Sequence, residues 1–172
     1  MEAIKENGLA KHIGVSNFTI KHLEALKPYC REMPEVNQIE LHPLLQQTEL
    51  RDYCQNNDII LTAYAPLGSG DRHQSMKSAQ EPDLMELESI VALAKKYQVS
   101  PAQILISWHL NRGCSVIPKA MQSQHLSQNM AAVQIQWLPE DLVMMKELDQ
   151  QYRFINGHFF DCPEQGYDWV FA

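Results

Sequence analysis

Polar and aromatic side chains recur where short apolar runs of this sequence end; they are Ser16, Asn17, Gln38, Tyr64 and Lys119. Asn17 and Gln38 each donate and accept hydrogen bonds, which suits a carboxamide group. Tyr64 offers a flat face for a planar ring. Lys119 offers a cation for a phosphate, and a helix that begins near Ser123 would add its amino end. Together these groups favour recognition of a nicotinamide dinucleotide.

Each of these residues also has a purely structural explanation. Ser16 and Asn17 could begin the next helix, Tyr64 could belong to the core, and Lys119 could be a solvated surface charge. The binding interpretation depends on their recurrence after four successive apolar runs.

The elements that must position these residues alternate between strand and helix. Strands are predicted at 12–16, 36–40, 59–64 and 114–117, and helices at 1–9, 19–26, 48–55, 83–97, from 100 onward, 123–132 and 139–150. We expect Thr19, Thr48, Asp83 and Ser100 to cap four of these helices. Such alternation is typical of a parallel sheet with crossover helices, in which ligands bind at the carboxyl ends of the strands.

Length and charge limit the possible classes of protein. The chain has 172 residues, too few for a complete (β/α)8 barrel, which needs ~250. With 14 Lys and Arg against 21 Asp and Glu, its formal net charge of −7 argues against a nucleic-acid partner. The absence of a long apolar run and the charged start predict no membrane span, no secretory leader and a cytoplasmic location. The scattered Cys30, Cys54, Cys114 and Cys162 predict reduced packing thiols and no metal site.

Four motifs of the sequence match one known family. They are Gly-Val-Ser-Asn-Phe at 14–18, Val-Asn-Gln-Ile-Glu-Leu-His-Pro at 36–43, Thr-Ala-Tyr-Ala-Pro-Leu-Gly-Ser at 62–69 and Ile-Pro-Lys at 117–119. In order and spacing the chain resembles the aldo-keto reductases, from residue 1 to about 152. The resemblance implies the α/β fold of the TIM-barrel family. It also implies that this single domain, 1–172, is the C-terminal half-barrel of about four parallel strands with helices plus extra helices, and that 152–172 forms its substrate-loop tail.

The resemblance also implies a cofactor, NADP(H) in preference to NAD(H), and a role for each matching residue. Ser16, Asn17 and Gln38 would hold the nicotinamide carboxamide, and Tyr64 would stack on the ring. The path of the pyrophosphate and ribose would be lined by Ala65, Leu67, Ser69 and Asp71. Lys119 would meet the adenosine ribose or its 2′-phosphate, while Gln128 and Asn129 would approach the adenine.

Three residues depart from the family pattern near the expected 2′-phosphate. Ala120 stands where the family often has Ser, His125 where an Arg is usual, and Gln128 where Glu is common. These changes remove a hydroxyl and a permanently charged fork that binds phosphate. They predict weakened discrimination between NADPH and NADH.

The implied activity is NAD(P)H-dependent reduction of aldehydes and ketones to alcohols, with a small carbonyl substrate in the full-length parent. The four residues with which the family performs catalysis, Asp, Tyr, Lys and His, lie on the first half of its barrel, so no catalytic residue is assigned here and this chain alone is predicted to be inactive. An alternative is a non-catalytic half-barrel that serves as a binding or assembly module and dimerises through open sheet edges; the oligomeric state stays open. The aromatic residues Phe154, Phe159, Phe160, Tyr167 and Trp169 could shape a substrate pocket or merely cover the barrel.

Overall fold

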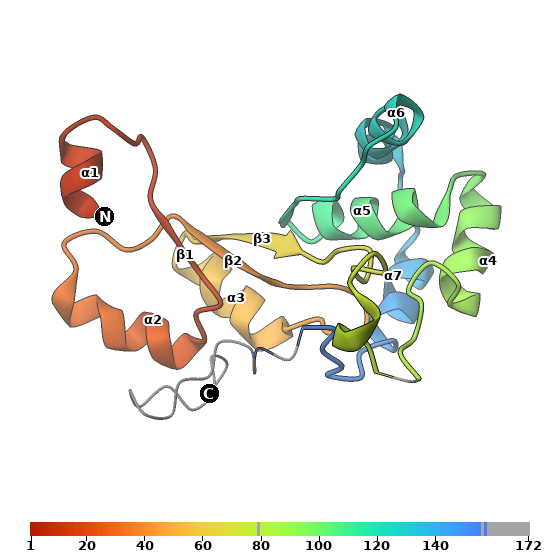
Figure 1. Cartoon of the computed structure of the whole chain (residues 1–172), viewed down its shortest axis with the longest axis horizontal. Helices are drawn as coiled ribbons and strands as arrows, with labels where there is room; N and C mark the ends of the chain where they lie inside the picture. Colours follow the sequence, from red (N-terminus) through yellow and green to blue (C-terminus); the bar gives the residue numbers. More distant parts are fainter. Residues whose placement is uncertain (79, 156, 158–172) are drawn as a thin grey trace. The chain divides into compact units, whose positions relative to one another are not determined.

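Short strands and helices alternate along the chain in the computed structural model, which describes residues 1–78, 80–155 and 157 (Figure 1). The strands are β1 (Gly14–Ser16), β2 (Val36–Glu40), β3 (Ile60–Tyr64) and β4 (Ser115–Val116). The α-helices are α1 (Glu2–Glu6), α2 (Ile20–Leu26), α3 (Thr48–Asn56), α4 (Glu88–Tyr97), α5 (Pro101–Asn111), α6 (Ser123–Ala131) and α7 (Pro139–Lys146). Three 3-10 turns complete the set: η1 (Lys27–Tyr29), η2 (Gln74–Met76) and η3 (Ala132–Gln134).

The four strands form one parallel sheet in the order β1-β2-β3-β4, which confirms the predicted α/β class. Gly14 of β1 lies opposite Val36 of β2, and Ser16 lies opposite Gln38. A Cβ atom on Gly14 would stand 2.8 Å from the carbonyl oxygen of Val36, so this close approach of two backbones requires glycine. The strand order puts β1 and β4 at its two ends, the edges on which the assembly alternative depends.

The described residues pack as two compact units. The first contains Met1–Ile39 and Gln47–Thr62, and the second contains Glu40–Gln46 and Ala63–Phe154. In the first unit, α1 buries no residue and is attached through charge, since Lys5 lies 2.6 Å from Glu32 and 2.8 Å from Glu35. The organisation of residues 1–172 as a single domain stays a prediction.

The second unit contains an apolar core of buried residues. Its buried members are Leu44, Leu84, Ile90, Leu93, Ala94, Ile104, Leu105, Trp108, Met145 and Phe154. Helices α4 and α5 contact each other, and α5 is buried without a break from Gln103 to His109. The amino group of Lys96 on α4 lies 2.7 Å from the carboxylate of Asp141 on α7. Helices α4 and α7 are therefore joined by charge as well as by apolar contact.

Two of the four predicted helix caps are confirmed and two are wrong. Thr19 and Ser100 each accept a hydrogen bond from a backbone N–H of the following turn. Thr48 is the first residue of α3, and the left-handed Gln47 before it is the cap position. Asp83 accepts from the backbone N–H of Met85 at 2.8 Å in a local turn, so α4 begins only at Glu88.

Several predicted boundaries are also wrong. The first strand begins at Gly14 rather than residue 12, and the last is reduced to Ser115–Val116. The first helix ends at Glu6, with Gly8 left-handed just beyond it. The last helix ends at Lys146 instead of 150, because the backbone N–H groups of Gln150 and Tyr152 both turn to the carbonyl oxygen of Leu44.

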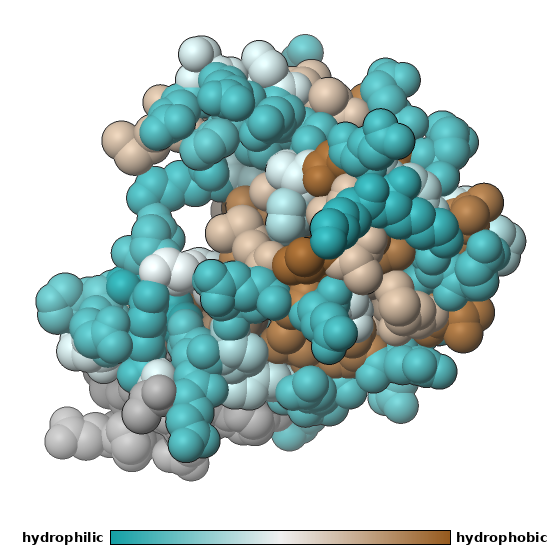
Figure 2. Space-filling model, turned by 90° about the vertical axis from the view of Figure 1, so that its right-hand side faces the viewer, coloured by the Kyte–Doolittle hydropathy of each residue, from teal (hydrophilic) through white to brown (hydrophobic). Residues whose placement is uncertain are grey.

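The surface of the second unit exposes several apolar side chains. Met121, Met130, Val133 and Val143 are all more than half exposed. Figure 2 shows brown and tan apolar groups beside one another across the middle of the view, with teal polar groups around them. Within residues 1–78, 80–155 and 157, no helix has the length and apolar character needed to span a bilayer.

Two sequence predictions extend past the described residues. Phe154 is buried, with 5% of its surface exposed, whereas Phe159, Phe160, Tyr167 and Trp169 lie outside the described part of the chain. Cys54 and Cys114 are buried and Cys30 is half-buried, while Cys162 lies outside the described part.

Candidate functional site

The three residues expected to hold a carboxamide lie together in the first unit, at the carboxyl ends of β1 and β2. The Ser16 hydroxyl donates to the carbonyl oxygen of Gln38 at 2.9 Å, and the backbone N–H of Asn17 donates to the same oxygen at 2.9 Å. Asn17 has a left-handed backbone with φ 59°. Its amide and that of Gln38 are both only partly buried. Two amide side chains are thus held at one edge of the sheet, where each can donate and accept.

Asn37 positions this edge, a role that sequence reasoning missed. Its side chain is fully buried, its Nδ2 donates to the carbonyl oxygen of Phe18 at 2.8 Å, and its Oδ1 accepts from the N–H of Phe18 at 3.3 Å. The two bonds fix the chain as it leaves β1. An inward-facing polar residue in an apolar strand is the signal that could have pointed to it.

Tyr64 ends β3 in the second unit and is half-buried. Burial, followed by the negative charge of Glu40, raises the pKa of its phenol to about 12. A general acid works best when its pKa lies near the working pH, so Tyr64 is a poor proton donor. Its ring face is the feature that remains useful for binding.

A buried carboxylate, Glu40, lies at the end of β2. Its Oε1 is 3.1 Å from Nε2 of His42, which is also fully buried, and accepts the N–H of Phe154 at 2.6 Å. Its Oε2 lies 3.5 Å from the guanidinium of Arg153. Glu40 therefore joins the end of β2 to the segment around Phe154.

The loop after Tyr64 contains the predicted pyrophosphate residues and has a strained backbone. Ala65 and Ser69 adopt φ 51° and 50°, and Gly68 between them has φ 85°. With Asn17, predicted site residues make up three of the seven left-handed non-glycine residues in the described ranges. Such conformations cost about 1–3 kcal/mol each and gather at functional sites, where surrounding contacts impose them.

The structure brings together two other predicted residues, Asp71 of this loop and Lys119 after β4. The Lys119 ammonium donates to the Asp71 carboxylate and lowers its pKa. The Asp71 and Lys119 side chains are 59% and 68% exposed, and water screens such an exposed ion pair so strongly that it contributes little to stability. The lysine can therefore exchange this carboxylate for another anion at little cost.

The remaining predicted residues lie at or just before α6. Ala120 precedes the helix, His125 is exposed, and Gln128 and Asn129 follow it by three and four residues. Residues at these spacings share one face of a helix. No residue of α6 is fully buried, and on this face His125 is exposed while Gln128 and Asn129 are partly buried.

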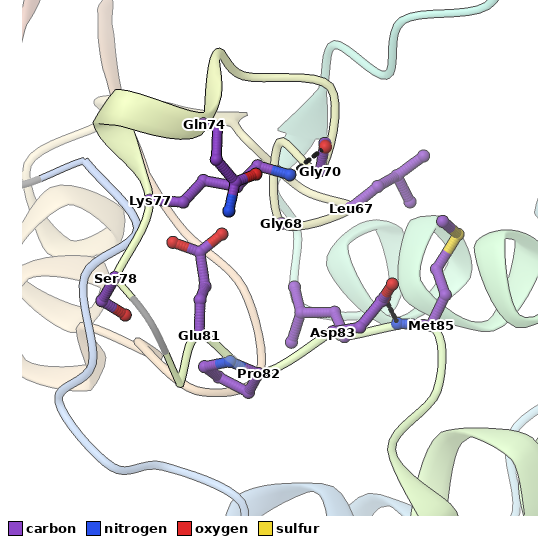
Figure 3. Close-up of a pocket in the computed structure, with 11 residues that line it drawn as sticks. Leu67, Gly68, Gly70, Gln74, Lys77, Ser78, Glu81, Pro82, Asp83 and Met85 are labelled. Carbon is purple, nitrogen blue, oxygen red and sulfur yellow. Dashed lines mark hydrogen bonds between the residues drawn. The ribbon is translucent and has the colours of Figure 1, made fainter.

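A pocket of about 290 Å³ lies beside the loop (Figure 3). Leu67, Gly68 and Gly70 line it from the loop, together with Gln74, Lys77, Ser78, Glu81, Pro82, Asp83, Leu84 and Met85. The Lys77 ammonium reaches across to donate to the carbonyl oxygen of Gly70. Of these residues, sequence reasoning singled out only Leu67 for the site, because the rest are brought in by loop geometry rather than by a motif.

The model of the "Aldo/keto reductase family" matches residues 1–150. The chain is 40% identical to "Aldo/keto reductase slr0942" of Synechocystis, over 97% of this chain and 51% of that protein. It is 38% identical to human "Aldo-keto reductase family 1 member C4", over 95% and 51%.

A solved structure of an aldo-keto reductase complexed with NADPH superposes with a TM-score of 0.81 and 31% identity, covering 92% of this chain and 48% of that one. The chain spans about half the length of these relatives. A family model that covers 1–150 and a fold that superposes this well lead to one conclusion: the chain belongs to the aldo/keto reductase family.

Proposed function

We propose that this chain contains the dinucleotide-binding half of an NAD(P)H-dependent carbonyl reductase that works in the cytoplasm. The observation behind the proposal is the similarity to an aldo-keto reductase complexed with NADPH. When bound, the dinucleotide supplies a hydride to the carbonyl carbon of an aldehyde or ketone, and a proton on the oxygen completes the alcohol. Small carbonyl compounds are the proposed substrates of the whole protein.

The residues of this chain bind and orient. Ser16, Asn17 and Gln38 hold the nicotinamide carboxamide, with the donors and acceptors that this group requires. Tyr64 presents its ring face to the nicotinamide. The pyrophosphate and ribose follow the loop Ala65, Leu67, Ser69 and Asp71, and Lys119 with the α6 residues Gln128 and Asn129 receives the adenosine end.

Proton donation is not assigned to any residue of this chain. Tyr64 holds its proton too tightly, because burial and Glu40 raise its pKa to about 12. The 172 residues alone are therefore proposed to bind the dinucleotide without reducing a carbonyl compound.

Titration of the purified chain with NADPH, followed by tryptophan fluorescence, tests this proposal. We expect saturable binding, no oxidation of NADPH with a generic aldehyde, and Kd raised about tenfold by Tyr64→Leu, because loss of a stacked aromatic ring costs roughly 0.5–1.5 kcal/mol beyond area. Tyr29→Leu is the matched control, since Tyr29 is 87% exposed on η1.

Any other result of this titration would contradict a specific part of the proposed function. A chain that binds no dinucleotide would contradict the cofactor site and favour the assembly alternative, which sedimentation would then show as a dimer. Turnover of the aldehyde would contradict the proposed inactivity. An equal effect of both tyrosine substitutions would remove Tyr64 from the site.

Weak discrimination between the two dinucleotides is a separate expectation. His125 and Ala120 occupy the positions at which the family pattern has an arginine and a serine that would bind the 2′-phosphate. The His125 side chain is exposed. We expect the Kd values for NADPH and NADH to be similar in matched titrations. A hundredfold preference for NADPH would contradict this, because it requires ~2.7 kcal/mol of phosphate recognition.

A further inference from the structure

Arg72, immediately after the proposed pyrophosphate loop, has four protein acceptors although only 8% of its side chain is exposed. Its Nε donates to the carbonyl oxygen of Ser69 at 3.1 Å, and its Nη1 donates to that of Met76 at 3.1 Å. Its Nη1 also donates to the carbonyl oxygen of Phe154, 82 residues away in sequence. Its Nη2 pairs with the Glu81 carboxylate, whose side chain is 11% exposed.

These contacts join the two walls of the pocket in Figure 3. One wall consists of the loop and η2, from Leu67 to Ser78, and the other runs from Glu81 to Met85. Arg72 holds the first wall at Ser69 and Met76 and the second at Glu81. Arg72 does not itself line the pocket, but its hydrogen bonds connect the two chain segments that form the walls.

The fourth contact extends the connection into the buried interior. Phe154 accepts from Arg72 through its carbonyl oxygen and donates its N–H to Glu40 at 2.6 Å. The Phe154 ring lies 5.6 Å below the guanidinium and 4.7 Å from the His42 ring. One continuous set of contacts thus runs from the loop through Arg72 and Phe154 to Glu40.

We propose that Arg72 is a positioning residue that fixes the pocket loop against Glu81 and Phe154, and so couples dinucleotide binding to the segment around Phe154. The proposal rests on the proposed function of the loop. Lysine cannot replace arginine here, because only a planar fork of five donors can serve four acceptors at once.

The test compares Arg72→Lys and Arg72→Met with the unchanged chain, using NADPH as the probe. We expect both variants to raise the Kd about tenfold, mainly through faster dissociation in stopped-flow fluorescence. Hydrogen exchange supplies the second readout. In the unchanged chain, NADPH should slow hydrogen exchange at the amides of residues 68–77 and of Phe154. In both variants, NADPH should cause no further slowing of exchange at Phe154.

Matched variants separate positioning from general stability. Arg51→Met removes an arginine whose partner, Asp52, is its exposed neighbour, and it should change neither Kd nor exchange at Phe154. Glu81→Gln retains an acceptor for Arg72, so its Kd for NADPH should lie between those of the unchanged chain and Arg72→Lys.

Failure of dinucleotide binding and failure of the Arg72 positioning role give different results. If the unchanged chain binds no NADPH, the proposed function fails, while Arg72 is still judged by exchange without ligand, which Arg72→Lys should accelerate at both 68–77 and Phe154. Unchanged exchange at Phe154, or a loss of stability with the NADPH dissociation rate unaltered, would overturn the positioning role.

Discussion

Replacing Glu40 with alanine is expected to lower the free energy of unfolding by about 3–5 kcal/mol, the cost of removing one partner from a buried ion pair. The carboxylate is fully buried and touches His42, the N–H of Phe154 and Arg153. Its loss leaves a buried donor without an acceptor and a positive charge without its nearest compensation. Urea unfolding at neutral pH measures the change.

Two variants make this expectation specific. Glu32→Ala breaks the pair between Glu32 and Lys5, whose side chains are 54% and 30% exposed, and should lower the free energy of unfolding far less than Glu40→Ala does. Glu40→Gln keeps an oxygen for the N–H of Phe154, so its loss of unfolding free energy should lie between those of Glu40→Ala and Glu32→Ala. If Glu40→Ala were no more harmful than Glu32→Ala, Glu40 would not be the structural centre described above.

The second large effect is an acid-side loss of stability caused by His109. This imidazole is fully buried on α5, and burial, followed by the charges of Arg112 and His42, lowers its pKa to about 3. Neither ring nitrogen has a hydrogen-bond partner among the described residues. Folded His109 therefore stays neutral, whereas the unfolded chain takes up a proton below its ordinary pKa of about 6.5.

The chain becomes less stable as the pH falls, because the unfolded state binds the His109 proton and the folded state does not. The stabilisation is fully present above pH 6.5 and is lost as the pH falls toward 3, at about 1.4 kcal/mol per pH unit. We expect His109 alone to lower the free energy of unfolding by about 2 kcal/mol between pH 7 and 5.

Unfolding free energies measured across this range test the assignment. His109→Gln should flatten the pH dependence of the unfolding free energy by one proton. Parallel curves for His109→Gln and the unchanged chain would show that other groups produce the acid sensitivity.

Much of the fold was predictable because its signals are local. The apolar runs that became β1 to β4 and the caps at Thr19 and Ser100 are read from a few neighbouring residues. Strand alternation then placed Ser16, Asn17 and Gln38 at one edge, as observed.

The errors and omissions have a different origin. Thr48 and Asp83 look like caps in sequence, but a left-handed Gln47 and a local turn at Met85 satisfy the backbone instead. Arg72 and Glu40 depend on Phe154, which lies 82 and 114 residues away, and no periodicity reports such distant partners. The contacts that allow Glu40 and Arg72 to be buried come from residues distant in sequence, so sequence patterns alone do not reveal them.

The left-handed backbone at Asn17, Ala65 and Ser69 affects how natural or engineered variants should be judged. At Ala65, a change to valine looks mild by side-chain chemistry, yet a β-branched residue strongly resists positive φ. A change to glycine looks more drastic there, yet it relieves the conformational constraint in the folded state. Similarity scales built on side chains would therefore rank substitutions in this loop in the wrong order.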